Sequence, residues 1–530
     1  MQKLPIGIQS IEKIRTDNYV YVDKTQFALE LIEGDAPHYF LSRPRRFGKS
    51  LFLSTLAAIF QGNKDLFEGC HISERNYDWQ PYPVLFFNFG DIANQTTEAL
   101  KNDLIDSLTK AGKEQGLAVE GPSLESQLKA LVKALASKGQ VVVLIDEYDK
   151  PIIDNLNNLE VADGNRKLLQ SFFGVFKGLD QYIKFTFITG ISRFTKVSLF
   201  SQANHLNDIS LDAKYADMMG YTYEEIVQYF DKHMQAIAQE QSRTAEDVLA
   251  EIKTWYNGYR FAEETIYVYN PFSTLNYLSK RKPRSYWYAT GTPAFLLEQV
   301  SKHPSNLVPL SGIRAEENEL MSLGSIEEID LKALMFQTGS LTIEGYSTAS
   351  KHYQLGFPNQ EVREAFTKSL IKHFAKLDAT LSAEMGLFLE AHDLTAFFDR
   401  MQQLLASFPY QLFIKAQERT YHGFLLSLLS GMGLEVAAET PSSLGRLDLL
   451  VEVEGTTYII EVKLDSSPAE GLRQIRDKQY HAPFLGQGKT IALVGLSLSS
   501  KSRNIATWAG ELLDTHGAII QKLLPEDKQL

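Results

Sequence analysis

The sequence predicts an α/β protein of about three domains, at roughly 100–200 residues for each domain. The apolar runs Val141–Ile145 and Phe185–Gly190 within residues 1–210 suit strands that are buried on both faces. Helical patterns alternate with these runs, as at Leu51–Phe60 and Leu124–Ala136. Strands that alternate with helices imply a parallel sheet with helices on both sides.

Residues 211–410 carry mostly helical patterns, for example at Tyr223–Glu240 and Leu394–Phe408, and we expect a helical lid and a connector there. Residues 411–530 change character again. Their pattern predicts a helix over 411–429, followed by strands over 447–454 and 456–464 that a tight turn at Gly455 joins. A helix over 469–480 and a strand over 490–496 come next. This order predicts a small α/β domain that is separate from what precedes it.

Composition limits the classes of function. The net charge of -12 weighs against a constitutive, non-specific nucleic-acid binder, which is usually basic. Residues 411–530 hold 12 Lys and Arg against 14 Asp and Glu, so nucleic-acid contact there needs a local patch or a metal. The single cysteine, Cys70, permits no internal disulfide. Since no apolar run reaches the length of a signal peptide core or a membrane span, we expect a cytoplasmic protein without membrane contact.

The segment Arg43–Ser50 precedes a helical run and has the pattern of a phosphate-binding loop. In such a loop, Gly48 and the helix N-terminus direct backbone N–H groups at an anion. Lys49 would add a charge at the outer phosphates, and the Ser50 hydroxyl would bind Mg²⁺. The general pattern has a glycine where this chain has Arg43, so the alternative is a basic turn before a helix.

Two carboxylates, Asp146 and Glu147, end the strand that would be the partner of this loop. Asp146 would hold Mg²⁺ directly or through water, and Glu147 would polarise the water that attacks the γ-phosphate. The alternative is an ordinary solvated strand end. Arg193 would stabilise the γ-phosphate charge, or is a surface arginine. Arg45 and Arg46 would contact phosphates or a partner. Together the two motifs predict a site for ATP and Mg²⁺.

A second set of polar residues lies near the end of the chain. Asp448 and Glu461 fall on adjacent predicted strands that the turn at Gly455 joins, so their side chains can converge. Glu461 and Lys463 are two residues apart and point to the same face of their strand. Two carboxylates can bind Mg²⁺ for phosphodiester hydrolysis, and a lysine beside them can orient the water or stabilise developing charge. The alternative is a cross-strand salt bridge on a solvated face.

Three further residues would complete this second site. Glu418, on the preceding helix, would supply a third carboxylate to the metal, and its alternative is an exposed helix acid. Gln474 and Tyr480, on the following helix, would line the site.

Several of these motifs together resemble the AAA-ATPase-like proteins, a bacterial family that joins a P-loop ATPase to a C-terminal PD-(D/E)XK nuclease-superfamily domain. The resemblance lies in Ile6–Ile8, Tyr21–Thr25, Arg43–Ser50, Asp146–Asp149, Thr189–Ser192, Asn257–Tyr259 and Asn270–Pro271. The family shows the same phosphate loop, so Arg43 departs from the general pattern and not from the family's. The resemblance implies an α/β, AAA+-type ATPase domain over 1–210 with a helical lid, then a restriction-endonuclease-like αβββαβ core.

Three functions follow from these residues. The first is an ATP- and Mg²⁺-dependent nuclease that acts on nucleic acid, with DNA as the expected substrate. The second is an ATP-driven switch whose C-terminal domain binds nucleic acid or a partner without cutting. The third is a regulatory nucleotide-binding protein with an inert C-terminal fold. The acidic balance favours the second, whereas Asp448, Glu461 and Lys463 favour the first. A role in defence against foreign DNA rests on analogy alone, and oligomerisation stays open.

Overall fold

The computed structural model of the chain describes residues 1–193, 206–287, 313–324, 329–374, 380–408, 418–432, 434–442 and 445–525. These residues form two compact units. The first contains the described residues up to 360, and the second contains those from 361 onward. The predicted division into three domains at residues 210 and 410 stays a prediction. No helix in the described ranges is long and apolar enough to cross a membrane.

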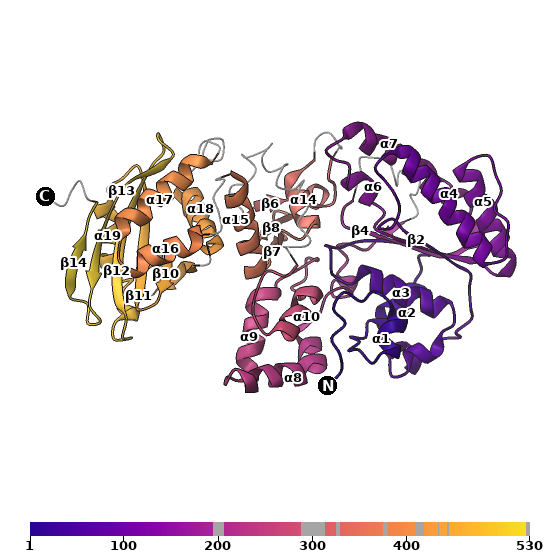
Figure 1. Ribbon diagram of the computed structural model, residues 1–530, viewed down its shortest axis with the longest axis horizontal. Helices are drawn as coiled ribbons and strands as arrows, with labels where there is room; N and C mark the ends of the chain where they lie inside the picture. Colours follow the sequence, from indigo (N-terminus) through magenta and orange to yellow (C-terminus); the bar gives the residue numbers. More distant parts are fainter. Residues whose placement is uncertain are drawn as a thin grey trace. The chain divides into compact units, whose positions relative to one another are not determined.

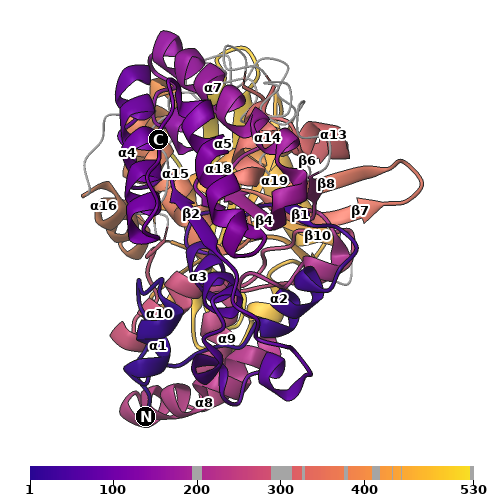
Figure 2. The same ribbon diagram turned by 90° about the vertical axis from the view of Figure 1, so that its right-hand side faces the viewer.

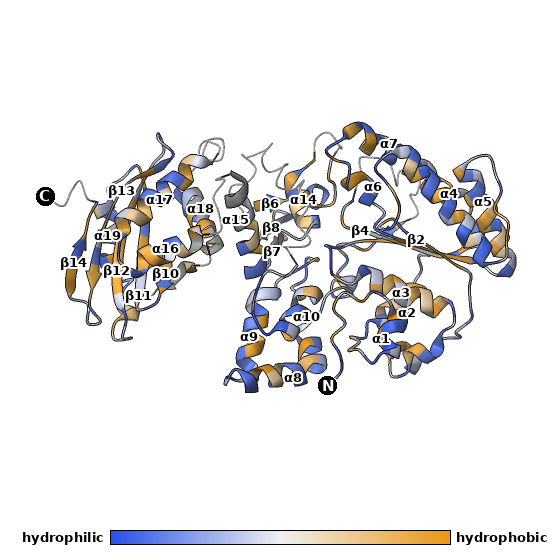
Figure 3. Ribbon diagram, in the orientation of Figure 1, coloured by the Kyte–Doolittle hydropathy of each residue, from blue (hydrophilic) through white to orange (hydrophobic). Residues whose placement is uncertain are grey.

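A five-stranded parallel sheet is the centre of the first unit (Figure 1). Across the sheet the strands are β2 (Val84–Asn88), β3 (Val141–Asp146), β4 (Ile183–Gly190), β1 (His38–Ser42) and β5 (Asn207–Asp208). Each neighbouring pair is parallel, as the alternation of strands and helices predicted. β1 and β3 are buried along their length, and Figure 3 colours the strands of this sheet mostly hydrophobic. The carboxyl ends of the strands therefore lie at one edge of the sheet.

Helices cover both faces of this sheet (Figure 1). On one face lie α1 (Ile11–Thr16), α2 (Thr25–Ile32) and α3 (Lys49–Phe60). On the other lie α4 (Thr97–Glu114), α5 (Leu124–Leu135), α6 (Lys150–Ile153) and α7 (Leu159–Gly174). The sequence of α5 explains its formation, because Ser123 caps its first turn and Leu124, Leu128 and Leu135 repeat at helical spacing and are buried.

Three more helices of the first unit pack together, namely α8 (Tyr223–Glu240), α9 (Ala245–Tyr256) and α10 (Pro271–Lys280). The residues that precede them, Thr222, Thr244 and Asn270 respectively, cap the three helices. Each capping side chain accepts a hydrogen bond from a backbone N–H of the first turn. Their shared core also contains Val20 and Val22. The segment that precedes α2 is therefore held against these three helices by apolar packing.

A small antiparallel sheet also belongs to the first unit. Its order is β6 (Ile313–Ala315), β8 (His352–Gly356) and β7 (Thr342–Ser347), with the short helices α13 (Glu317–Leu320) and α14 (Leu331–Gln337) between β6 and β7. Figure 2 shows β7 and β8 as a projecting hairpin. The sequence predicted mainly helices in this region. These strands were missed because they are short, and because the register shifts at Gly345, which interrupts the alternation of side chains.

The second unit is built on a six-stranded mixed sheet. The order across it is β14 (Ile519–Leu523), β13 (Asn504–Leu513), β12 (Thr490–Ser499), β11 (Thr456–Leu464), β10 (Gly445–Val453) and β9 (Glu435–Ser442). Only β11 and β12 are parallel among the neighbouring pairs of the described strands. The predicted strands correspond to β10, β11 and β12. The structure adds β9, β13 and β14.

Helices pack on both faces of this second sheet. They are α16 (Leu381–Glu390), α17 (Leu394–Ser407), α18 (Glu418–Gly431) and α19 (Pro468–Asp477). α15 (Gln360–Phe374) precedes them in the chain. Ile459 packs with Ile475 of α19, whereas its neighbour Tyr458 donates a hydrogen bond to Leu389 O of α16. Because successive side chains of a strand point to opposite faces, α16 and α19 lie on opposite sides of β11. The order α18, β9, β10, β11, α19, β12 is the αβββαβ order that the family resemblance implied.

The turn at Gly258 has a backbone conformation and a close contact that only glycine can adopt without strain. Gly258 has φ +102°, and a Cβ there would lie 1.9 Å from Pro358 O. We expect Gly258→Ala to lower the stability of the first unit by at least about 3 kcal/mol, because backbone strain and overpacking add. Gly69 has φ +73° with open space around its Cβ position, so Gly69→Ala should cost only about 1 kcal/mol. Equal melting temperatures for the two variants in calorimetry would contradict this account.

Candidate functional site

The phosphate loop connects the end of β1 to the start of α3, as predicted. Gly48 precedes α3 with φ +96°, and Arg46 has φ +68°. These left-handed conformations turn the chain sharply, so that the backbone N–H groups of the first turn of α3 face the inside of the loop. The loop lies at the edge of the sheet where the carboxyl ends of β1 and β3 also meet.

Arg43 is a structural part of this loop. Its guanidinium is buried, donates hydrogen bonds to Ser210 O at 2.7 Å and Tyr215 O at 3.2 Å, and lies 4.3 Å from the centroid of the Phe261 ring. Burial lowers the pKa of Arg43, and the Asp208 carboxylate opposes this effect. On its other side the loop is held by the Trp287 indole, which donates to Arg45 O at 2.8 Å. Arg43 therefore anchors the loop from behind, which a glycine cannot do.

The Lys49 ammonium lies inside the loop. It donates hydrogen bonds to Arg43 O and Pro44 O, both at 2.9 Å. Burial lowers its pKa, and the carboxylates of Asp146 and Glu147 oppose this effect. Among the described residues, no carboxylate oxygen lies within ion-pairing distance of Lys49. A buried cation that only carbonyl dipoles solvate is suited to bind an anion.

Asp146 ends β3 beside the phosphate loop. The Ser50 hydroxyl donates a hydrogen bond to its carboxylate, and Glu147 N donates to its Oδ1 at 3.0 Å. Burial raises the pKa of Asp146, and the Ser50 hydrogen bond and the Lys49 charge oppose that rise. A hydroxyl next to a carboxylate is the oxygen pair that a phosphate-bound Mg²⁺ uses, so Ser50 and Asp146 fit the predicted metal site.

Glu147 follows Asp146 in a left-handed conformation with φ +51° and lines the same cavity as Lys49 and Ser50. Its Oε2 lies 2.8 Å from where a Cβ on Gly90 would be. A side chain at position 90 would therefore displace this carboxylate from its place beside the end of β2. The sequence reasoning missed Gly90, although a glycine directly after a strand is a signal for a close approach.

Asp149 fixes the strand ends that carry these groups. Its carboxylate accepts hydrogen bonds from Ile191 N at 3.1 Å and from Ser192 N at 2.6 Å. Burial raises the pKa of Asp149, and its hydrogen bonds with Ser192 oppose that rise. The ends of β3 and β4 are thereby joined, and Asp146 and Glu147 are held in place.

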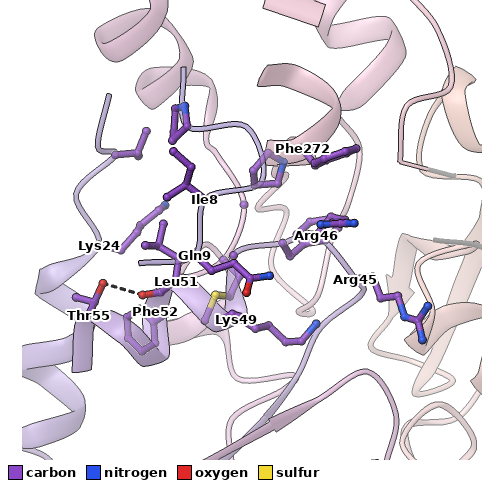
Figure 4. A pocket seen from close by; sticks show the side chains of 18 of the residues that line it. Ile8, Gln9, Lys24, Arg45, Arg46, Lys49, Leu51, Phe52, Thr55 and Phe272 are labelled. Carbon is purple, nitrogen blue, oxygen red and sulfur yellow. Dashed lines mark hydrogen bonds between the residues drawn. The ribbon is translucent and has the colours of Figure 1, made fainter. Parts of the chain in front are cut away.

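A cavity of about 370 Å³ opens from the phosphate loop (Figure 4). The loop and α3 form one wall. The other walls come from the N-terminal segment with Ile8, the segment Met218–Tyr221 and α10 with Phe272 and Leu275. The Arg46 guanidinium lies 4.8 Å from the centroid of the Phe272 ring. The volume suits a small organic ligand with a polar and an apolar end. The sequence reasoning missed these other walls.

In the second unit, Asp448 on β10 and Glu461 on β11 lie on adjacent antiparallel strands, as predicted. Asp448 Oδ2 accepts a hydrogen bond from Val462 N at 2.9 Å. Glu461 is fully buried. Burial raises the pKa of Glu461 to about 7, and the neighbouring Asp448 carboxylate contributes to the rise. Two carboxylates that disfavour each other's charge are an arrangement that a divalent cation relieves.

The surroundings of Glu461 fit a metal ion. Its Oε1 accepts hydrogen bonds from Lys463 Nζ at 3.0 Å and from the Gln474 amide. Its Oε2 is buried and has no hydrogen-bond partner among the described residues. An orphaned carboxylate oxygen beside a second carboxylate is the donor set that Mg²⁺ or Mn²⁺ prefers, so Asp448 and Glu461 would hold such an ion. Lys463 and Gln474 orient Glu461.

Comparisons with known proteins match the regions of the chain that contain the two sites. Residues 5–200 match the family described as predicted AAA-ATPase, and residues 416–508 match the PD-(D/E)XK nuclease superfamily. A protein of Azotobacter chroococcum mcd 1, named "Uncharacterized protein in vnfD 5'region", is 36% identical over 527 residues, which cover 97% of this chain and 99% of that protein. The chain belongs to the AAA-ATPase-like family. Its C-terminal domain is of the PD-(D/E)XK superfamily.

A more distant likeness concerns a solved structure. The Aeropyrum pernix ORC2 protein, in ADPNP–ADP complexes, matches 65% of this chain and 93% of its own chain, with 10% identity and a TM-score of 0.27. The parallel sheet with its flanking helices and the C-terminal mixed sheet, together with the family matches, confirm the predicted fold class.

Two predicted residues of this AAA-ATPase-like protein lie elsewhere. Arg193 Nη1 pairs with Asp208 Oδ2 at 2.7 Å and lines a second cavity with Asp212 and Glu263, so the structure does not bring it to the phosphate-loop cavity. Its role at the γ-phosphate stays a prediction. Tyr480 packs in the apolar core of the second unit with Ile475.

Glu418 faces the end of β11. Its Oε2 accepts from Leu464 N at 2.9 Å, and its Oε1 lies 3.7 Å from Lys463 Nζ. In the described part of the chain, no three His, Cys, Asp or Glu side chains are grouped as metal ligands. Glu418 as a third metal ligand therefore stays a prediction. One turn further along α18, His422 hydrogen-bonds Asp448 O through Nε2, a contact that the sequence gave no signal for.

The anchoring role of Arg43 can be tested by a conservative change. Arg43→Lys keeps the charge but cannot donate to two carbonyls while stacking on Phe261, so it should lower stability by about 2 kcal/mol. Arg45→Lys, in the same loop but only half-buried, is the matched control and should change stability by less than about 0.5 kcal/mol. Urea denaturation measures both. An Arg43→Lys variant as stable as its control would show that Arg43 does not anchor the loop.

Proposed function

We propose that the first unit binds and hydrolyses ATP with Mg²⁺, and that the second unit cleaves nucleic-acid phosphodiesters with a divalent metal. The buried Lys49 ammonium, which has no carboxylate partner among the described residues, is the main support for the first activity. The orphaned Oε2 of Glu461 beside Asp448 is the main support for the second. DNA is the expected substrate of the second unit.

In the first unit, the N-terminus of α3 and the Lys49 ammonium would bind the phosphates of ATP. Ser50 and Asp146 would hold Mg²⁺, which neutralises phosphate charge when bound. Glu147 lines the same cavity and would accept the proton of the attacking water.

In the second unit, Asp448 and Glu461 would hold Mg²⁺ or Mn²⁺, which when bound supplies an activated water and neutralises the phosphate. Lys463 lies on the same face of β11 as Glu461, so its ammonium would stabilise the charge that develops on the attacked phosphate. Gln474 holds Glu461 Oε1 and leaves Oε2 for the metal.

Glu147→Gln separates hydrolysis from binding. The amide keeps the shape of the carboxylate but cannot accept a proton, so ATP turnover should fall by roughly 10²-fold or more while ATP affinity is retained. Turnover is followed by phosphate release, and affinity by calorimetry. Glu114→Gln, at an exposed position near the end of α4, is the matched control and should behave like the unchanged protein. Undiminished turnover in Glu147→Gln would reject the role of Glu147 as the base.

Asp448→Asn tests the metal site of the second unit. The amide oxygen can still accept from Val462 N, but the loss of charge weakens metal binding, so cleavage should fall by roughly 10²-fold or more with ATP turnover unchanged. The assay uses plasmid DNA, single-stranded DNA and RNA with Mg²⁺ or Mn²⁺, with and without ATP. Glu454→Gln, at the exposed turn between β10 and β11, is the control and should leave cleavage unchanged.

A second candidate function is a switch in which the C-terminal domain binds nucleic acid or a partner without cutting. The acidic balance of residues 411–530, with 12 Lys and Arg against 14 Asp and Glu, supports it. In that case the unchanged protein and Asp448→Asn would show the same background in every cleavage assay, which would reject the nuclease.

A further inference from the structure

The lining of the cavity at the phosphate loop combines charged, polar and apolar side chains. Lys49, Ser50 and Glu147 are the charged or hydroxyl groups that the proposed function assigns to phosphates and Mg²⁺. Apolar side chains such as Ile8 and Leu275 contribute to the remaining lining. A nucleotide has two corresponding parts, because a charged triphosphate is joined to a flat base. The apolar part of the lining is therefore where a base would lie.

Lys24 is a buried cation in this lining that the phosphate chemistry does not use. In Figure 4 its side chain lies apart from that of Lys49, with Gln9 between them in the view. Lys24 Nζ donates to Asp217 O at 2.7 Å and pairs with Glu225 Oε1 at 2.6 Å. Because the Glu225 carboxylate neutralises it, Lys24 has little attraction for phosphates.

The Lys24 ammonium nevertheless has more donors than hydrogen-bond partners among the described residues. An ammonium has three N–H donors, and two of them have partners among the described residues. The Thr55 hydroxyl, another polar group of this lining, donates to Leu51 O at 2.9 Å. Gln9 is exposed. Lys24 is thus a buried side chain of this lining that has a donor left for a ligand.

The chain around Lys24 holds it firmly. Asp23 accepts hydrogen bonds from Thr25 N at 2.9 Å and from His71 N at 2.6 Å, which fixes the turn before α2. Glu225 belongs to the capping box of α8, where it accepts from Thr222 N at 2.9 Å. The motif Tyr21–Thr25 therefore places one ammonium at a defined point of the cavity wall, and such a preorganised donor is suited to selective recognition.

We propose that Lys24 recognises the base of the bound nucleotide by donating a hydrogen bond to a ring nitrogen of adenine. This inference rests on the proposed binding of ATP at the phosphate loop. The ring nitrogens of adenine are acceptors, so a side chain that can only donate matches them. The apolar side chains around Lys24 would cover the faces of the base. Lys24 is a specificity residue in this account and takes no part in hydrolysis.

The test measures binding of two probes, ATP and inorganic tripolyphosphate, which lacks a base. Lys24→Met replaces the ammonium with an apolar side chain and should weaken ATP binding by about 10-fold or more, the effect of one charged hydrogen bond. Tripolyphosphate binding should be unchanged. Calorimetric titration with Mg²⁺ measures both affinities. A variant that binds ATP as tightly as the unchanged protein would overturn the inference, and so would an equal loss for both probes.

The control variant is Glu225→Gln, which removes the ion pair but keeps the Lys24 ammonium in the cavity. It should retain ATP affinity within about 3-fold, even where its melting temperature falls, because the donor to the base remains. An ATP loss equal to that of Lys24→Met would show that Lys24 acts only by supporting α8, and would overturn the inference.

The unchanged protein supplies a measurement that does not depend on the folding of any variant. ATP should bind it at least about 10-fold more tightly than tripolyphosphate. Equal affinities would overturn the inference about Lys24 but would leave the proposed phosphate site in place. A protein that binds neither probe would instead reject the proposed ATP site, together with the inference that rests on it.

Discussion

A buried ammonium without a carboxylate partner is costly, and the first unit is organised to hold Lys49 in that position. Two loop carbonyls solvate its Nζ, and the buried Arg43 keeps those carbonyls in place. Gly48 turns the chain so that the N-terminus of α3 faces the same point. Asp146 and Glu147, at the end of β3, lie near enough to oppose the fall in the pKa of Lys49. In the proposed function, the free energy released when an anion binds there would couple this fold to a phosphate ligand.

The second unit presents the opposite imbalance. Asp448 and Glu461 converge on adjacent strands, and the buried Oε2 of Glu461 has no partner among the described residues. Lys463 offsets part of this charge through the other oxygen of the same carboxylate. The first unit thus has an excess positive charge at Lys49, as a phosphate-binding loop has. The second unit has an excess negative charge at Asp448 and Glu461, as the metal site of a metal-dependent nuclease has. The family matches cover both regions of the chain, residues 5–200 and 416–508.

The sequence alone predicted what depends on local pattern. The period of two along a strand placed Glu461 and Lys463 on one face, and the apolar run before Asp146 predicted a strand end at the phosphate loop. It did not predict contacts between distant segments. Arg43 bonds to Ser210 O, and Arg193 pairs with Asp208 because β5 lies beside β1. Pairings of this kind are set by the order of strands in the sheet, which no local pattern encodes.

The most direct test of this account is a crystal structure of the protein with Mg²⁺ and a non-hydrolysable ATP analogue. We expect the phosphates to lie at the N-terminus of α3, Lys49 Nζ to donate to them, and Ser50 and Asp146 to lie next to the metal. Phosphates bound elsewhere, or a Lys49 that still donates only to the carbonyls of Arg43 and Pro44, would contradict it.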